Sequence, residues 1–178
     1  WFSSPSFDAC IVQMMGVFFH GGCLVPIESA ASLRRSPWWQ NFTCLGAPPG
    51  PIAHLVAGDA LPPNLQLVNT GAETVPAPLI EALARQSSVQ RIHNFYGPTE
   101  GGGYCTTHTL FDRADDNAPR TVNRTWLGRT IGTAISNARL RVVSAFGQDV
   151  PAGWPGELWI AGPLVARGYL KPGSAEVV

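Results

Sequence analysis

Residues 93–100 read His-Asn-Phe-Tyr-Gly-Pro-Thr-Glu, and this stretch decides how the whole chain is interpreted. It follows Val89–Ile92, an alternating apolar run that predicts a short strand. A Gly-Pro turn then presents Thr99 and Glu100 beyond the carboxyl end of that strand, where open α/β sheets bind ligands. With the ring of Tyr96, these groups suit a nucleotide, because they offer a stacking face, a phosphate contact and a metal ligand. Taken alone, so short a stretch more often forms an ordinary loop with a surface glutamate.

The composition describes one globular domain and gives no sign of a nucleic-acid or membrane partner. The 178 residues include 12 basic and 12 acidic side chains, with 45% hydrophobic and 13% charged residues. This length suffices for one domain with a core, and the low charge predicts a surface that is partly an interface. No basic patch indicates nucleic acid, and no apolar run reaches membrane-spanning length. Because the chain begins at Trp1 and ends at Val178 within a pattern, we expect a piece of a longer protein.

The four cysteines and four histidines lack the spacing of metal ligands or of a disulfide framework. We expect the cysteines to be reduced and buried in a cytoplasmic protein, rather than bridged or metal-bound. For the histidines we expect structural or surface roles. These residues are Cys10, Cys23, Cys44, Cys105, His20, His54, His93 and His108.

Strands and helices alternate through the first part of the chain. A helix capped by Ser6 or Asp8 and running to about His20 is apolar nearly all round, so it should be buried on most sides. Residues 28–41 predict a helix fragment and a loop. The other predicted elements are strands at 23–27, 42–47, 65–70 and 89–92 and helices at 52–57 and 76–85. This order predicts an α/β fold, with a parallel sheet and flanking helices.

The pattern changes after Gly103. Residues 112–125 are polar and predict an exposed loop, whereas 138–143 and 157–161 predict strands between Gly and Pro turns. We therefore divide the chain into an α/β subdomain at 1–125, which would hold the substrate pocket and the nucleotide loop, and a β-rich subdomain piece at 126–178.

Three segments resemble motifs of the adenylate-forming, or AMP-binding, enzymes, in the order in which that family has them. Residues 94–100 resemble its Asn-x-Tyr-Gly-Pro-Thr-Glu motif, and residues 2–9 resemble the pocket-opening motif of its peptide synthetase branch. Residues 156–170 are similar to its Gly-Glu-Leu and Ala-Arg-Gly-Tyr motif. The resemblance spans nearly the whole chain and implies an internal fragment of a nonribosomal peptide synthetase adenylation domain. The implied fold is part of the large N-terminal domain, an α/β unit followed by a β-rich subdomain.

The resemblance implies a ligase that joins an amino acid to AMP, releases pyrophosphate from ATP and then loads the phosphopantetheine thiol of a carrier domain. Positioning and charge neutralisation supply most of the catalysis in such chemistry. By resemblance the catalytic residues are Thr99, at the α-phosphate, and Glu100, which holds Mg²⁺. Tyr96 would lie against the adenine, and Asn94 would meet its amino group. The implied ATP-binding set is Gly71, Ala72, Glu73, Asn94, Phe95, Tyr96, Gly97 and Thr99. Carrier and condensation domains, on the same chain or another, are the implied partners.

Asp8 indicates the class of substrate. In the peptide synthetase branch an aspartate here pairs with the α-ammonium group of an amino acid, because an unpaired buried charge is costly. Alternatively, Asp8 is only a helix cap. The resemblance places the substrate pocket at Asp8, Ala9, Val12, Gly46, Val68, Thr70, Phe95, Gly103 and Tyr104. These mainly apolar walls imply an uncharged side chain. The bulky Phe95 alters the depth of the pocket, and a shortened segment at 28–45 affects the placement of Gly46. The sequence therefore does not identify the amino acid.

Several parts of the family's machinery lie outside these residues: a phosphate loop, a ribose-binding aspartate and a catalytic lysine. We therefore expect the 178 residues alone to be inactive. One alternative is an acyl- or aryl-CoA ligase, against which Asp8 argues. The other is a decayed adenylation-like domain that is kept as an interaction piece, and the full gene would decide that case.

Overall fold

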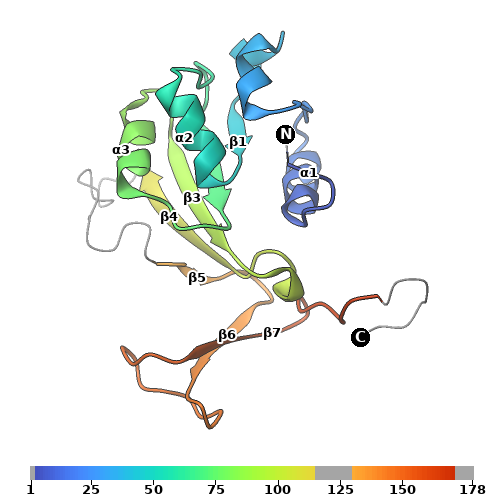
Figure 1. Cartoon of the computed structure of the whole chain (residues 1–178), viewed down its shortest axis with the longest axis vertical. Helices are drawn as coiled ribbons and strands as arrows, with labels where there is room; N and C mark the ends of the chain where they lie inside the picture. The colour runs from blue at the N-terminus through green and yellow to red at the C-terminus, as the bar shows by residue number, and fades with distance from the viewer. Residues whose placement is uncertain (1–2, 115–129, 171–178) are drawn as a thin grey trace.

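A five-stranded sheet forms the centre of the computed structural model, which describes residues 3–114 and 130–170 (Figure 1). The strand order is β1-β2-β3-β4-β5. The first three strands, β1 (Cys44–Gly46), β2 (Leu67–Gly71) and β3 (Arg91–Tyr96), are parallel. The last two, β4 (Thr106–Asp112) and β5 (Thr133–Ala134), are antiparallel. The predicted α/β fold with a parallel sheet is confirmed, and two antiparallel strands that the sequence pattern did not predict extend it.

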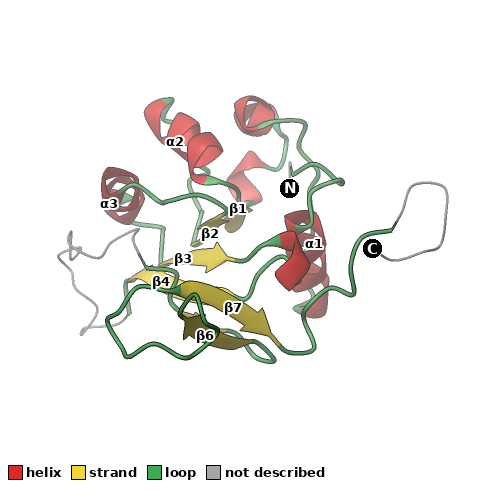
Figure 2. Cartoon of the chain, turned by 60° about the horizontal axis from the view of Figure 1, so that its bottom comes forward, coloured by secondary structure: helices red, strands yellow, loops and turns green. Residues whose placement is uncertain are grey.

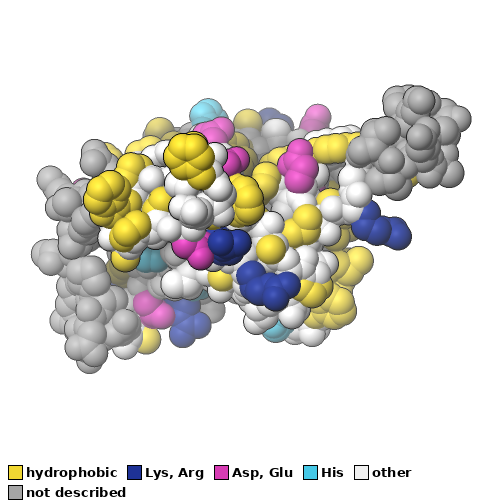
Figure 3. Space-filling model, turned by 90° about the horizontal axis from the view of Figure 1, so that it is seen from below, with side chains coloured by type: hydrophobic (Ala, Val, Ile, Leu, Met, Phe, Trp, Pro, Cys, Tyr) yellow, Lys and Arg dark blue, Asp and Glu magenta, His cyan; other side chains and the backbone are white. Residues whose placement is uncertain are grey.

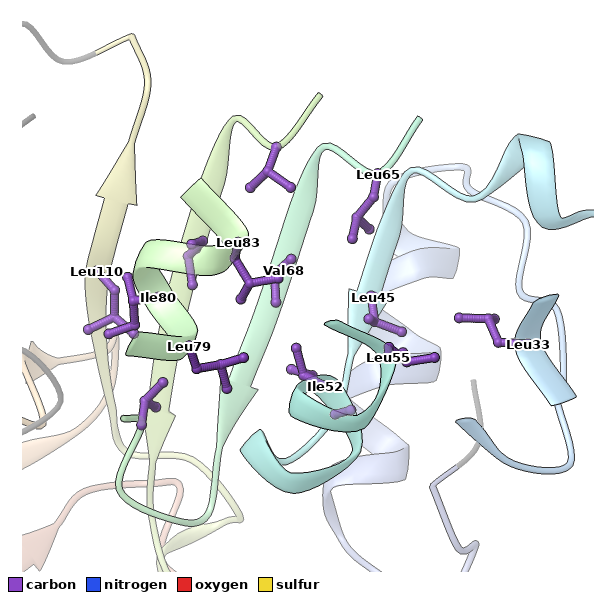
Figure 4. Packing of buried hydrophobic residues seen from close by; sticks show 14 residues of the cluster. Leu33, Leu45, Ile52, Leu55, Leu65, Val68, Leu79, Ile80, Leu83 and Leu110 are labelled. Atoms are coloured by element: carbon purple, nitrogen blue, oxygen red, sulfur yellow. The ribbon is translucent and has the colours of Figure 1, made fainter. Parts of the chain in front are cut away.

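Two helices, α2 (Pro49–Ala57) and α3 (Ala77–Arg85), cover one face of this sheet (Figure 2). Both have proline at their start, where the missing N–H costs little. Figure 4 shows apolar side chains filling the space between these helices and the strands. The core contains Leu45, Ile52, Leu55, Val68, Ile80, Leu83 and Ile92. This apolar layer therefore holds in place the strands that carry the candidate site.

The helix α1 (Ala9–Phe19) lies behind the sheet in Figure 4, on the face opposite α2 and α3. It rests on the β1 edge, since a Cβ added to Gly46 would stand 3.3 Å from Nε2 of Gln13. The prediction that this helix is buried on most sides is wrong. Within α1 only Ala9 and Cys10 are buried, and the ring of Phe19 is 83% exposed. A single sequence shows that a helix is apolar, but it does not show which neighbours cover it.

Residues 23–27 form no strand, contrary to the prediction, and connect α1 to two short 3₁₀ helices, η1 (Ala30–Arg35) and η2 (Trp39–Asn41). These helices match the expected helix fragment and loop. All four cysteines are free. Cys23 and Cys44 are exposed, so the expectation that every cysteine is buried is wrong for these two. In the part of the chain that the structure describes, no helix is both long and apolar enough to cross a membrane.

A separate antiparallel pair, β6 (Arg139–Val143) and β7 (Glu157–Ala161), confirms the two strands predicted near the C-terminus. Large aromatic side chains in and around this pair are exposed, among them Phe146, Trp154 and Trp159. Figure 3 views the molecule from below and shows hydrophobic side chains among a few scattered charges. The predicted boundary between residues 125 and 126, and most of the predicted loop at 112–125, lie outside the described residues.

Candidate active site

The turn after β3 is shaped by close backbone packing. The strand extends to Tyr96, beyond its predicted end, so the first half of the motif lies within the sheet. A Cβ added to Gly97 would stand 2.7 Å from the backbone nitrogen of Cys105, which donates a hydrogen bond to the carbonyl of Tyr96. After the single 3₁₀ turn η3 (Thr99–Gly101), Gly103 has a φ of +86°, in the region that favours glycine. The glycines therefore allow the chain to turn back within a few residues.

Side chains of β2 and β3 alternate between the two faces of the sheet. Val68 pairs with Ile92 across the two strands, and both lie in the core beneath α2 and α3. His93 and Phe95 therefore point to the other face, toward α1. There the centroid of the Phe95 ring lies 5.2 Å from the centroid of the Tyr104 ring. This aromatic pair forms one side of the candidate substrate site.

Asp8 reaches the same region from the N-terminal end of α1. Its carboxylate carbon would lie 3.5 Å from a Cβ added to Gly103. Burial raises the pKa of Tyr104, and the negative charge of Asp8 raises it further. Asp8 directly precedes α1, yet its side chain makes no capping hydrogen bond to the helix. The geometry thus gives no support to the alternative in which Asp8 is only a helix cap.

Glu100 lies in η3, and its side chain is exposed. Its carboxylate accepts a hydrogen bond from the hydroxyl of Tyr169 at 2.9 Å. The pKa of Glu100 is lowered first by a hydrogen bond from its own backbone N–H and then by Tyr169, while burial and the charge of Asp8 oppose both effects. Because Asp8 influences Glu100 electrostatically, two acids that are remote in sequence act on one region. A glutamate is ionised at neutral pH without any shift, and the lowered pKa of Glu100 favours the same state.

The residues expected to bind the nucleotide lie at the carboxyl ends of β2 and β3. Asn94 is buried, and its Nδ2 lies 3.5 Å from the carbonyl oxygen of Thr130. Its Oδ1 has no hydrogen-bond partner among residues 3–114 and 130–170, so this acceptor is available to an amino group. The ring of Tyr96 is 38% exposed and can stack against a base. Thr99 is exposed on the same turn, as an approaching phosphate requires.

The turn after β2 supplies the second part of the expected nucleotide set. A side chain on Gly71 would collide with the carbonyl oxygen of Phe95, so the packing of β2 on β3 itself requires glycine here. Ala72 has a φ of +66°, which is unusual for a residue with a side chain. Both Ala72 and Glu73 are exposed beside this turn.

Glu100 fits a Mg²⁺ ion that is held mainly by phosphate oxygens. In the described part of the chain no three His, Cys, Asp or Glu side chains gather as a metal cage. Mg²⁺ commonly takes one or two protein carboxylates and completes its shell with water and phosphate. A single exposed and ionised carboxylate is what such a site needs from the protein.

Two of the expected pocket residues, Val68 and Thr70, do not lie on the face toward α1. Val68 is 0% exposed in the core under α2 and α3. By alternation Thr70 shares its face, where it pairs with Asn94 at the ends of β2 and β3. The residue between them, Asn69, pairs with Gly46 on one side and His93 on the other, so it faces α1. In this strand a shift of one residue exchanges the faces, so Asn69 rather than Val68 is the residue on the α1 side. The sequence did contain a signal for Asn69. Along the strands, alternation puts Asn69 on the same face as the expected pocket residues Gly46 and Phe95.

The remaining expected pocket residues lie near α1. Ala9 is buried at the start of the helix, and Val12, one turn later, is 41% exposed. Gly46 sits under Gln13 at the β1 edge. Tyr169 was not expected at the site, because the sequence separates it from Glu100 by 69 positions.

Comparison with known proteins agrees with this geometry. The model of a family described as AMP-binding enzyme matches residues 1–170. The chain belongs to the AMP-binding enzyme family. This AMP-binding chain is 31% identical over 169 residues to a linear gramicidin synthase of Brevibacillus parabrevis, an alignment that covers 95% of this chain and 3% of that protein. The resemblance found in the three motifs is thereby confirmed, and the chain spans only a small part of that relative.

Two solved structures show how far the fold itself is shared. PA1221, an NRPS protein containing adenylation and PCP domains, has a TM-score of 0.72 and 25% identity, over 94% of this chain and 34% of that one. O-succinylbenzoate coenzyme A synthetase from Bacillus subtilis also has a TM-score of 0.72, with 16% identity over 95% of this chain and 33% of that one. Because both structures share the fold, the substrate has to be inferred from individual side chains.

Proposed function

We propose that this chain forms the substrate- and nucleotide-binding part of a nonribosomal peptide synthetase adenylation domain. The complete domain would convert an amino acid and ATP into aminoacyl-AMP and pyrophosphate. It would then transfer the aminoacyl group to the phosphopantetheine thiol of a carrier domain, beside a condensation domain. The observation that carries the proposal is the convergence of Asp8 and Glu100 on one region, with aromatic side chains between α1 and the turn after β3.

Asp8 binds and orients the amino acid in this proposal. Its carboxylate makes no capping hydrogen bond to α1, so it is available to an ammonium group. A half-buried cation without a partner charge is strongly disfavoured, so the pairing supplies selectivity for amines. With the ammonium held at Asp8, the substrate carboxylate is directed toward the turn that carries Thr99 and Glu100. Fixing the two reactants in this way lowers the entropic part of the barrier.

The ends of β2 and β3 bind ATP. Tyr96 stacks on the adenine, Asn94 accepts a hydrogen bond from its amino group, and Thr99 donates to the α-phosphate. Gly97 and the turn at residues 71–73 form the surrounding backbone surface. Glu100 would hold Mg²⁺, and a bound ion would supply positive charge to offset that of the phosphates.

The proposed pocket walls are Ala9, Val12, Gly46, Phe95, Gly103 and Tyr104, with Asn69 in place of Val68 and Thr70. The amide of Asn69 is then a polar group on walls that otherwise favour an uncharged apolar side chain. The Oδ1 atom of Asn69 has no hydrogen-bond partner within residues 3–114 and 130–170. Asn69 therefore contributes an amide to the recognition of the amino-acid side chain.

An acyl- or aryl-CoA ligase is the second candidate, since O-succinylbenzoate coenzyme A synthetase shares the fold. An acid without an amino group gives Asp8 no partner. A ligase for such acids would therefore place an unpaired carboxylate beside its substrate, which disfavours this candidate.

Pyrophosphate exchange by the complete protein tests the proposal across amino acids and their α-hydroxy analogues. We expect exchange with one or a few amino acids and at least roughly 100-fold less with the matching hydroxy acid, as sites built for a polar group discriminate strongly. Asp8→Ala should abolish amino-acid-dependent exchange and remove that preference. Asp149→Ala, which breaks an exposed ion pair with Arg141, is the control and should leave exchange unchanged.

Equal exchange by Asp8→Ala and wild type would refute the role of Asp8. Activation of hydroxy or fatty acids by the wild type would favour the ligase alternative. The isolated 178 residues should show no exchange, because the catalytic lysine and the phosphate loop of the family lie outside them.

A further inference from the structure

The last of the three family motifs, residues 156–170, makes a direct contact with the candidate metal turn. The hydroxyl of Tyr169 donates a hydrogen bond of 2.9 Å to Oε1 of Glu100. Both side chains are exposed, so burial does not force them together. Figure 1 shows the red segment after β7 passing beside the turn that follows β3. The motif therefore has a contact that neither substrate binding nor nucleotide binding explains.

The same segment also fixes the backbone of that turn. The N–H of Ala166 donates a hydrogen bond of 2.8 Å to the carbonyl oxygen of Glu100. A Cβ added to Gly102 would stand 2.6 Å from the carbonyl oxygen of Leu164, so the two backbones approach as closely as glycine permits. Glu100 is thus held through its carbonyl by Ala166 and through its carboxylate by Tyr169.

An unrestrained glutamate on the surface has several rotatable bonds, and a metal that binds it must first fix them. Tyr169 occupies one carboxylate oxygen and so restricts the orientation of the other. Carboxylates that bind metals are commonly held by such hydrogen bonds, and loss of the outer partner typically weakens metal affinity about 10–100-fold.

We infer that Tyr169 is a positioning residue that orients the Glu100 carboxylate through Oε1 and leaves Oε2 available to a divalent cation. This inference rests on the proposed function, since it takes Glu100 as the metal ligand. The segment after β7 then contributes to metal binding at a turn of the five-stranded sheet, although it touches no substrate.

The test measures metal binding directly in the complete protein. Binding of Mn²⁺, as a substitute for Mg²⁺, is followed by its electron paramagnetic resonance signal in the presence of ATP. Binding of a fluorescent ATP analogue is measured with Mg²⁺ and with EDTA. Tyr169→Phe removes only the hydroxyl, and we expect about 10-fold weaker Mn²⁺ binding, unchanged binding of the analogue in EDTA and an unchanged melting temperature.

A double-mutant cycle separates positioning from a general effect of the segment. Glu100→Gln should weaken metal binding strongly, and adding Tyr169→Phe to it should have no further effect, because the charged ligand that Tyr169 orients is already lost. Leu170→Ala, a change at the exposed neighbour of Tyr169, serves as the control and should leave metal binding unchanged.

The inference is overturned if Tyr169→Phe binds Mn²⁺ as the wild type does. It is also overturned if the variant weakens the analogue equally with Mg²⁺ and with EDTA, which would indicate a structural role alone. Failure of the proposed function looks different: the wild type would then bind neither ATP nor metal, or Glu100→Gln would have no effect.

Discussion

The two faces of the five-stranded sheet differ in what they expose, although the same strands form both. Toward α2 and α3, Val68 and Ile92 are completely buried in an apolar layer. Toward α1, their sequence neighbours Asn69 and His93 are half-buried and polar, and Phe95 meets a tyrosine there. Consecutive residues of β2 and β3 therefore serve different purposes: one set holds the sheet together, and the other lines the candidate site. Substitutions at adjacent positions should consequently give unlike results.

The largest effect is expected from Ile92→Ala on the helix-covered face. It leaves a cavity in the core and should lower the free energy of unfolding by about 3 kcal/mol. Hydrogen exchange measured by mass spectrometry in the complete protein should show faster exchange for peptides that cover β2 and β3. The adjacent variant His93→Ala should change this exchange much less. Equal acceleration in both variants would contradict the difference between the two faces.

The adjacent pair Val68 and Asn69 tests the same difference through substrate choice. Val68→Ala removes buried apolar volume and should cost about 2 kcal/mol of stability, with the ranking of activated amino acids unchanged. Asn69→Ala should leave stability nearly unchanged but alter that ranking about 10-fold, as expected for loss of one polar contact in a pocket. Pyrophosphate exchange across an amino-acid panel measures the ranking. A changed ranking in Val68→Ala alone would restore Val68 to the pocket.

The smallest effect concerns the pH dependence contributed by His93. Its pKa is lowered first by burial and then by Arg91, against an opposing contribution from Asp112. The folded protein thus favours the neutral imidazole, whereas the unfolded chain takes up a proton at higher pH. Neutral His93 therefore contributes its full share of folding stability above the ordinary pKa of histidine. This share is lost as the pH falls through that value toward the lower pKa of His93 in the folded protein. His93→Gln should reduce the difference in melting temperature between about pH 7.5 and about pH 5.5, and an unchanged difference would argue against this burial.

The order of elements in the first half of the chain could be predicted because each one carries a strong local pattern. The helix at Ala77–Arg85, for example, begins after a proline and buries one apolar stripe made by Leu79, Ile80 and Leu83. The strand at Thr106–Asp112 escaped prediction because it contains three threonines and a histidine, so it has no apolar alternation. Its three threonines are β-branched, however, and β-branched residues favour strands.

The site was predicted less completely than the fold, for two physical reasons. Motif resemblance places a residue along a strand but does not show which face it occupies, and the neighbours Val68 and Asn69 lie on opposite faces. Local pattern also contains no information on contacts between distant segments. The hydrogen bond from Tyr169 to Glu100 became visible only when the segment after β7 was placed beside the turn after β3.

The left-handed backbone of Gly103 has a consequence for how this pocket can diverge. Any L side chain there would be conformationally strained at a φ of +86°, besides standing against the carboxylate of Asp8. Evolution, or a designer of altered specificity, therefore has little freedom at the wall nearest Asp8, where we propose that the ammonium group binds. Variation is confined to positions such as Asn69 and Phe95, whose side chains project from regular strands. A randomised library that spares Gly103 and samples those positions should retain the largest share of variants that fold and keep the proposed selectivity for amines.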